Sequence, residues 1–286
     1  MSFLKKLLKT APTPTSDGAY EPSPLSLKLA TSPKTDFDGG TYASPYQGSD
    51  KRVLVVCTEE RNMKMANGKK FSTGNHPVEL GLPMLHLLSA GFEVDIVTPT
   101  GAPAVVEDWA MPREDATVMK LYQDYADALQ NPGSLADFVA TSLTDTSPYV
   151  AVFMPGGHGA MLGLPESDDL GKLLRWAHNQ DLFTLAICHG PAALLAAGNE
   201  ADFIYKGYKI AAFPDAVDKQ TPMIGYLPGH MPWKFGERLA SLGVEIVNKK
   251  ADAACHIDRK LITGASPKAA NNFGRLAAET LLSANR

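Results

Sequence analysis

The strongest structural signal in this chain is Thr184-Leu-Ala-Ile-Cys188-His189-Gly190-Pro191-Ala-Ala-Leu-Leu195. An apolar strand pattern runs into a polar pair, then into Gly-Pro, and then into small helix-forming residues. Pro191 suits the first position of a helix, where no N–H donor is needed, and Gly190 lets the backbone turn closely. This layout predicts a tight strand-to-helix turn that holds Cys188 on strained backbone beyond the carboxyl edge of a sheet.

The segments on both sides of this turn alternate between short apolar runs and helix patterns. The run 53–57 is typical of a central parallel strand, and Pro77 opens a helix that closes near Gly91. Further strands are expected at 92–98, 149–154, 182–187, 208–213, 244–247 and 260–263, and further helices from 167, 191, 233 and 266. The alternation predicts an α/β fold, a mostly parallel sheet with helices on both faces.

Two segments stand outside this alternation. Residues 1–50 are rich in Pro, Ser, Thr, Gly and Asp and are expected to form an arm that wraps the core, whereas residues 51–286 form the α/β domain. Residues 105–146 interrupt the strand–helix rhythm and are expected to fold over the site as a small lid. The first ten residues lack the apolar region of a signal peptide and are interpreted as a frayed terminus.

Composition excludes several classes of protein. The chain has 286 residues and a formal net charge of -4, and its basic residues are scattered among acidic ones, so no specific nucleic-acid partner is expected. No apolar run approaches the roughly 18 residues that span a bilayer. The three cysteines, Cys57, Cys188 and Cys255, are widely spaced and odd in number, which indicates a reducing, cytoplasmic location rather than a disulfide framework.

Cys188 is the candidate nucleophile. A thiol at a helix N-terminus is stabilised as thiolate by the helix dipole, and His189 beside it is a candidate base or proton shuttle. The alternative is a buried structural cysteine, because cysteine is among the most buried residues. Cys57 lies within an apolar strand and Cys255 lacks a strand–turn–helix setting, so neither is expected to react.

Other candidate groups are expected at the same edge of the sheet. The backbone amides of Gly156 and Gly157, after the strand 149–154, can form part of an oxyanion hole with the amide of His189. Glu79, at the start of the helix after the first strand, is a candidate acid or base, or simply a first-turn glutamate favoured by the helix dipole. After a later strand, either Asp215 or Asp218 can orient His189 as the third member of a triad.

Together these motifs resemble one family over nearly the whole chain. It is the glyoxalase III, protein deglycase and holding-chaperone branch of the ThiJ/PfpI superfamily. The phrases that carry the resemblance are Phe71-Ser-Thr-Gly-Asn-His-Pro-Val-Glu79, Trp109-Ala-Met-Pro112, Pro155-Gly-Gly-His-Gly159, Cys188-His-Gly-Pro191, Ala212-Phe-Pro-Asp-Ala-Val-Asp-Lys-Gln-Thr-Pro222 and Leu261-Ile-Thr-Gly-Ala-Ser-Pro267.

The resemblance implies a flavodoxin-like core, a small lid subdomain and a homodimer. It places the catalytic cysteine on Cys188, the histidine on His189 and the triad carboxylate on Asp218 rather than Asp215. Glu79 matches the glutamate that contacts the thiol.

The resemblance also implies a metal site in some members, formed by two histidines and a glutamate. Here Glu93 matches the carboxylate, but Leu88 and Tyr125 stand at the histidine positions, so no metal is predicted. The other histidines show no ligand spacing of the HxxxH kind; they are His86, His158, His178, His230 and His256.

The function implied is conversion of methylglyoxal or glyoxal to lactate or glycolate, without glutathione or any other cofactor. Cys188 forms a hemithioacetal, amides near Gly157 and His189 hold the oxyanion, and Glu79 or His189 moves a proton between the two carbons before the thioester is hydrolysed. Removal of early glyoxal adducts from proteins and nucleotides is a companion activity, with glycated or unfolded proteins as partners. The alternatives are a cysteine amidase or peptidase, and a non-enzymatic stress chaperone.

Overall fold

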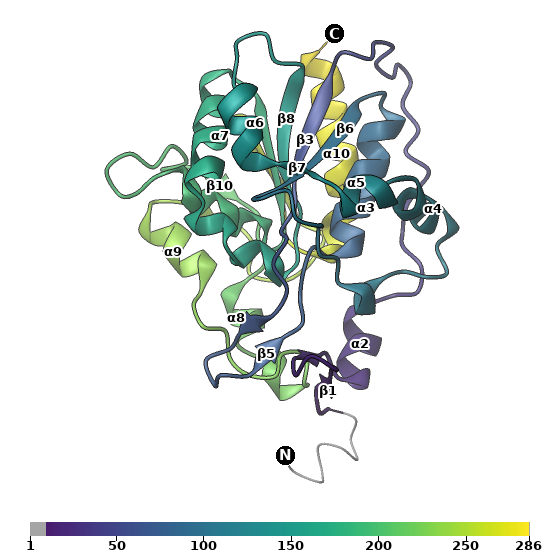
Figure 1. The fold of residues 1–286 in the computed structure, drawn as a ribbon, viewed down its shortest axis with the longest axis vertical. Coiled ribbons are helices and arrows are strands. Elements are labelled where there is room, and N and C mark those ends of the chain that lie inside the picture. The colour runs from purple at the N-terminus through teal and green to yellow at the C-terminus, as the bar shows by residue number, and fades with distance from the viewer. Residues whose placement is uncertain (1–9, 286) are drawn as a thin grey trace.

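The computed structural model describes residues 10–285, which are built around a seven-stranded sheet of order β12-β13-β9-β8-β3-β6-β7 (Figure 1). Its strands are β3 (Arg52–Val56), β6 (Glu93–Thr98), β7 (Gly133–Ser134), β8 (Tyr149–Met154), β9 (Phe183–Ile187), β12 (Cys255–Asp258) and β13 (Leu261–Gly264). All neighbouring strands are parallel except β12 and β13. The predicted α/β fold with a mostly parallel sheet is confirmed.

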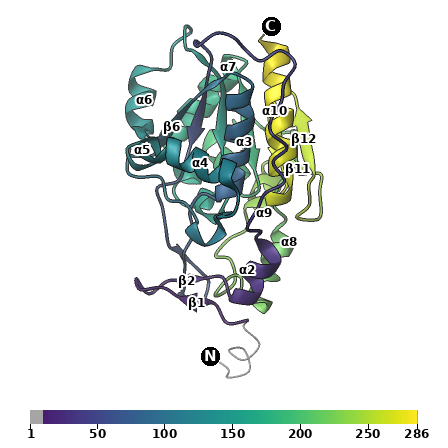
Figure 2. The same cartoon turned by 90° about the vertical axis from the view of Figure 1, so that its right-hand side faces the viewer.

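Helices cover both faces of the sheet. Figure 2 shows α3 (Pro77–Ser89) and α10 (Ala270–Ala284) side by side on one face, and α7 (Asp168–Asn179) with the 3-10 helix η4 (Gly190–Ala197) packs on the other. Because successive residues of a strand point to opposite faces, Val53 and Val55 of β3 join the core under α3 and α10. Leu54 joins the core under α7. The all-apolar strand pattern therefore reflects burial on both faces.

Two of the expected strands lie outside the main sheet. β10 (Lys209–Ile210) and β11 (Glu245–Ile246) pair with each other as a separate two-stranded parallel sheet. The edge next to β13 is already occupied by β12, which forms an antiparallel hairpin with it. At the closed end of this hairpin Asp258 lies opposite Leu261, three positions later. Closing so short a loop costs less conformational entropy than pairing with a distant strand, which favours this pairing.

The N-terminal arm runs along the core from residue 10; residues 1–9, interpreted above as a frayed terminus, lie outside the described residues. Its short strands β1 (Thr13–Pro14) and β2 (Tyr20–Glu21) join β5 (Lys70–Phe71) and β4 (Met63–Lys64) in a four-stranded sheet, and α2 (Pro24–Ala30) follows. Later arm residues contact α3: the Tyr42 hydroxyl lies 2.7 Å from Nδ1 of His86.

The segment 105–146 has two parts: the first lies at the cavity and the second at the edge of the main sheet. Its first part contains the 3-10 helix η1 (Asp108–Ala110), preceded by Glu107, which reaches the cavity described below. Its later part contains α4 (Ala116–Asp124), α5 (Ala126–Gln130), β7 and α6 (Leu135–Thr141). Because β7 pairs with β6, this later part is tied to the main sheet.

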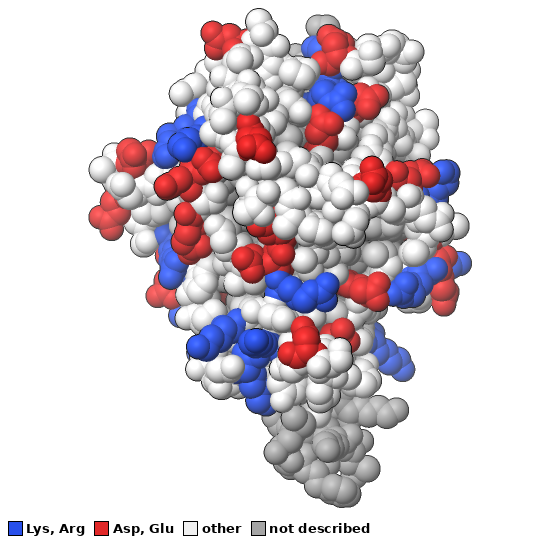
Figure 3. Space-filling model, in the orientation of Figure 1, with Lys and Arg blue, Asp and Glu red and all other residues white. Residues whose placement is uncertain are grey.

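The distribution of surface charge and the apolar character of the helices agree with what the composition indicates. Lys and Arg are interspersed with Asp and Glu over the face shown in Figure 3. None of the helices in the described part of the chain has the length and apolar character needed to cross a bilayer.

Candidate active site

Cys188 lies on the strained turn between β9 and η4. Its φ of 61° is in the left-handed region that few residues other than glycine adopt. Two hydrogen bonds hold this backbone: the Cys188 N–H donates to the Gly264 carbonyl (2.8 Å), and the Phe213 N–H donates to the Cys188 carbonyl (2.9 Å). At Gly190 any side chain would collide with the Met154 carbonyl, which explains the glycine. The turn predicted from the sequence is present.

The thiol is buried between His189 and Glu79. Cys188 is 4% exposed, and its Sγ lies 3.3 Å from Nδ1 of His189. A Cβ placed on Gly156 would collide with Oε2 of Glu79 and lie 2.7 Å from Cβ of Cys188, so both side chains pack against this glycine. The structure therefore brings together all three residues.

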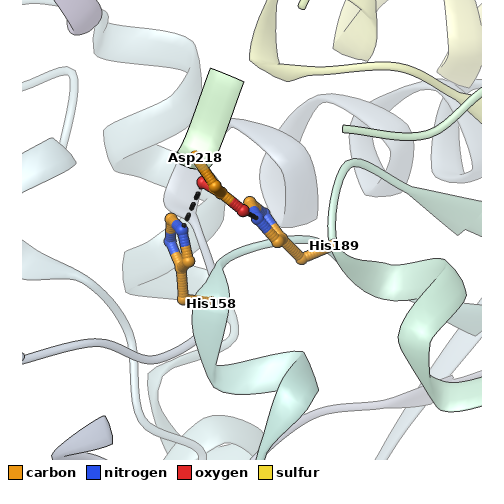
Figure 4. A group of neighbouring side chains, drawn as sticks. All are labelled: His158, His189 and Asp218. Atoms are coloured by element: carbon orange, nitrogen blue, oxygen red, sulfur yellow. Dashed lines mark hydrogen bonds and ion pairs between the residues drawn. The ribbon is translucent and has the colours of Figure 1, made fainter. Parts of the chain in front are cut away.

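Asp218 joins two histidines (Figure 4). It ends the short helix α8 (Asp215–Asp218), and its two carboxylate oxygens accept hydrogen bonds from Nε2 of His189 (2.8 Å) and Nε2 of His158 (3.0 Å). The rings of His158 and His189 lie 3.9 Å apart between centroids. All three side chains are buried, so the carboxylate fixes both imidazoles out of contact with bulk water.

The charges of this group set the tautomer of His189. Burial and, next to it, the neighbouring His158 lower the pKa of His189 to about 4, against the opposite effect of Asp218. Burial opposes ionisation of Asp218, but the attraction of the two histidines holds its pKa well below the usual range. At neutral pH a neutral His189 therefore donates its Nε2–H to the carboxylate, which leaves Nδ1 as an acceptor facing the thiol.

The expected lowering of the Cys188 pKa is wrong. Burial raises the pKa of this thiol well above its usual value, and a negative charge on Glu79 raises it further. Burial also raises the pKa of Glu79 well above its usual value. Desolvation of the charged form thus outweighs the dipole of the helix N-terminus. The resting thiol is neutral and needs a proton acceptor when it attacks.

Asp215, the other aspartate weighed from the sequence, has a different place. Its carboxylate accepts hydrogen bonds from the backbone N–H groups of Gly236 (3.2 Å) and Glu237 (2.8 Å) at the start of α9 (Phe235–Ser241). These amides have no partner within the helix, so Asp215 serves as a cap. The aspartate that hydrogen-bonds His189 is Asp218.

Gly157 places a backbone amide at the thiol. Its φ is 100°, and a Cβ there would collide with the Gly74 carbonyl and lie 2.7 Å from the backbone nitrogen of His76. The Gly157 N–H faces Cys188 and Glu79. An amide in this position can donate to an oxyanion that forms on a carbon bonded to the sulfur.

The site opens into a cavity of about 250 Å³. Besides the residues above, its lining includes Leu29 from the arm, Phe213, Ile224 and Tyr226, and two groups that the sequence analysis missed, His158 and Glu107. His158 lies within the quoted Pro-Gly-Gly-His motif but was judged only by the spacing of histidines along the chain. Glu107 has no sequence signal, because an isolated glutamate in a loop is ordinarily exposed.

Metal binding has little support from the donors present. At the position that the resemblance implies, Leu88 offers no donor atom, and burial raises the pKa of Tyr125, which keeps its phenol protonated. These residues do not fit a metal. Within residues 10–285 one group of three possible ligands lies close together, His158, His189 and Asp218, with the ligand atoms within 4.8 Å of one another. Those atoms are already hydrogen-bonded to one another.

Comparisons with known proteins agree with this geometry. Residues 71–280 match the DJ-1/PfpI family. The chain is 50% identical over 283 residues to the protein/nucleic acid deglycase HchA of Pseudomonas aeruginosa, covering 96% of this chain and 97% of that protein. It is also 50% identical over 268 residues to the HchA of Escherichia coli O157:H7, covering 94% of each.

Solved structures show the same fold at lower identity. Glyoxalase III of Candida albicans superposes with a TM-score of 0.63 at 23% identity and covers 83% of this chain and 98% of its own. The Rapid Encystment Protein of Francisella tularensis superposes with a TM-score of 0.66 at 23% identity and covers 81% of this chain and 99% of its own.

Proposed function

This chain belongs to the DJ-1/PfpI family, and from that membership and the site we propose that it is a glutathione-independent enzyme acting on reactive dicarbonyls. It converts methylglyoxal to lactate and glyoxal to glycolate, and it removes their early adducts from proteins and nucleic acids. The observation that carries the proposal is the buried Cys188 thiol on its strained turn, beside Glu79 and His189 in a small cavity.

The reaction begins with attack of the thiol on the aldehyde carbon, C1. The Sγ–H proton passes to Nδ1 of His189, 3.3 Å away, and Asp218 stabilises the imidazolium that forms. Glu79, protonated at rest because burial raises its pKa, donates a proton to the aldehyde oxygen. The amides of Gly157 and His189 hold this oxygen while its charge develops. The product is a neutral hemithioacetal on Cys188.

Glu79 is then a carboxylate and acts as the base. It takes the proton from C1, the electrons move to form the C1–C2 double bond of an enediol, and the same carboxyl returns the proton to C2. C1 becomes a thioester carbonyl. Water adds to it and gives one proton to the Glu79 carboxylate, which restores the resting carboxyl. The thiolate leaves and recovers its proton from His189, and the hydroxy acid departs.

The proposal is tested by incubating the purified protein with methylglyoxal and no glutathione. We expect enzymatically formed lactate in proportion to protein concentration. The matched control is the Cys188→Ala variant at the same concentration, which should form none. A wild-type preparation that consumes no methylglyoxal under these conditions would overturn the glyoxalase proposal.

Deglycation is the second activity that a specific observation favours. The two relatives at 50% identity are named protein/nucleic acid deglycases, so glycated protein and nucleic acid are proposed substrates, although no stable nucleic-acid complex is expected from the charge. A cavity of about 250 Å³ with a thiol 4% exposed suits a small molecule or one modified side chain. It does not suit an extended peptide, which weighs against the peptidase alternative.

Holding-chaperone action would depend on apolar surface rather than on the thiol. Three exposed apolar side chains, Leu29, Met223 and Ile224, belong to α2 and to the segment after α8. Protection of an aggregating client should therefore survive Cys188→Ala, whereas dicarbonyl turnover should not. The homodimer, the cytoplasmic location, the lid and the absence of a cofactor stay predictions.

Asp215 separates a stability effect from an activity effect. Because its carboxylate caps α9, we expect Asp215→Ala to lower the free energy of unfolding by about 1 kcal/mol and to leave kcat for methylglyoxal unchanged. Asp218→Ala, in contrast, should lower kcat for methylglyoxal. Urea unfolding and lactate assays of the two variants measure both quantities. Equal loss of kcat in both variants would contradict the assignment of Asp218.

A further inference from the structure

We propose that Glu107 is a second catalytic carboxyl, which contacts the dicarbonyl substrate and donates a proton to its C2 carbonyl oxygen. This inference rests on the proposed function and adds to it a residue that selects substrates with two adjacent carbonyl groups. It starts from a Glu107 carboxyl oxygen at the cavity wall that, like the carboxyl oxygens of Glu79, accepts no hydrogen bond of normal geometry.

The Glu107 side chain is buried, and only one of its two carboxyl oxygens accepts a side-chain hydrogen bond. It is 2% exposed and lines the cavity that contains Cys188 and Glu79. The Thr73 hydroxyl donates to its Oε1 (2.6 Å), whereas its Oε2 is buried and accepts no hydrogen bond of normal geometry. The backbone N–H groups of Gly74 and His158 face the carboxyl. A buried carboxyl oxygen left unpaired costs free energy, so its retention at a cavity wall points to a ligand that pairs with it.

The backbone fixes Glu107 next to the catalytic carboxyl. Its N–H donates to the Asn75 carbonyl (3.0 Å), and Asn75 pairs with Val106 as an isolated parallel bridge. Asn75 itself is held by its side-chain bonds to Thr58 and to the Val105 carbonyl. Two residues after Asn75 the helix α3 begins, and Glu79 lies in its first turn. The two carboxyls thus approach the cavity from adjacent, mutually bonded segments.

Its surroundings keep about half of Glu107 protonated at pH 7. Burial is the largest cause of its net pKa of about 7. The attraction of His158, the Thr73 hydroxyl and the backbone N–H groups of Gly74 and His158 lower the pKa and partly offset the effect of burial. The titratable groups that face it are Glu79 from α3, His158 from η2 (His158–Met161) and Tyr226 from the loop after η5 (Thr221–Met223). Cys188, His189 and His76 line the same cavity.

A neutral carboxyl here completes the proton balance of the isomerisation. When Glu79 takes the C1 proton, the C2 carbonyl oxygen becomes an enediol hydroxyl and needs a proton, which Glu107 donates. When Glu79 then protonates C2, the C1 hydroxyl must lose its proton as the thioester carbonyl forms, and the Glu107 carboxylate receives it. No oxidant, reductant or further reactant is involved, and an aldehyde without a second carbonyl has nothing for Glu107 to protonate.

The test compares Glu107→Gln with Glu114→Gln, a matched control in which an exposed glutamate seven positions later loses the same charge. The glutamine amide still donates a hydrogen bond to the C2 oxygen but cannot transfer a proton. We therefore expect kcat for methylglyoxal to fall about 10²-fold or more with little change in KM. The rate at which propanal, which has one carbonyl, adds to the Cys188 thiol should be the same in Glu107→Gln as in the wild type.

The pH profile gives a readout that a structural role would not move. Because the reacting form of Glu107 is protonated, wild-type kcat should fall as pH rises through about 7, and Glu107→Gln should lack this limb. Thr73→Val keeps the carboxyl but removes the hydrogen bond that lowers its pKa, so it should move the limb to higher pH; it also serves if Glu107→Gln does not fold. Suppose that the wild type forms lactate. If Glu107→Gln then leaves both kcat and the fall of kcat near pH 7 unchanged, or if Thr73→Val does not move that fall to higher pH, the role of Glu107 alone is overturned. A wild type that forms no lactate overturns both proposals.

Discussion

Replacement of Cys188 by alanine is expected to lower kcat/KM for methylglyoxal by at least about 10³-fold, which corresponds to ~4 kcal/mol in the activation barrier. The physical reason is that, among the described residues, Cys188 is the one thiol in the lining of the cavity, and a thiol both adds to an aldehyde and leaves from a thioester. The fold should persist, because the change removes one sulfur from a wall of the cavity. Lactate formation and circular dichroism of the purified variant measure the two effects.

Cys255→Ala is the matched control for that variant. Cys255 lies in the hairpin strand β12, and burial raises the pKa of its thiol to about 11, so it is unreactive at neutral pH. Its loss should leave turnover unchanged. Retention of a tenth or more of wild-type activity in Cys188→Ala would remove the covalent mechanism.

Glu79→Gln is expected to be the second most damaging change, with kcat lowered about 10³-fold. Glutamine fills the same space and still donates a hydrogen bond to the aldehyde oxygen, but it cannot take the C1 proton. The proton that His189 takes from the thiol can pass to the aldehyde oxygen in place of the Glu79 proton. Hemithioacetal should therefore accumulate on Cys188 while lactate formation nearly stops. Rapid-quench measurement of the adduct and of lactate distinguishes this block from a loss of binding.

Asp218→Asn is the comparison that ranks the carboxyls. Asparagine can keep its oxygen toward Nε2–H of His189 and turn its amide toward Nε2 of His158, because Asp218 has one oxygen on each histidine. His189 then keeps the tautomer that accepts the thiol proton, and the loss should be smaller than for Glu79→Gln. If Asp218→Asn proved the more severe change, the base would be reassigned to His189.

Much of this architecture was accessible from the sequence because its signals are local. The strand–Cys–His–Gly–Pro pattern predicts the turn because each of its last two residues indicates a particular backbone geometry. Gly190 allows a close approach of two backbone segments, and Pro191 fixes its own φ angle. The family resemblance was accessible for the same reason and is confirmed by the match over residues 71–280. The run Val53–Cys57 predicted a central strand because burial on both faces leaves a continuous apolar run.

The remainder depends on contacts between distant segments. The direction of the Cys188 pKa shift follows from burial and from Glu79, which is 109 positions earlier, and no local pattern around the turn contains either. Glu107 enters the cavity because the segment 105–107 pairs with Asn75. Likewise, β10 and β11 were recognised as extended, but their exclusion from the main sheet depends on which strand occupies its edge.

The central claim is that the chemistry passes through a covalent bond at Cys188, and peptide mass mapping after rapid quenching of the protein with methylglyoxal tests it most directly. The predicted result is an adduct of one methylglyoxal on the peptide that contains Cys188, formed and consumed at rates no slower than lactate production. An adduct confined to Cys57 or Cys255, or lactate formed at the full rate with Cys188 unmodified throughout, would contradict it.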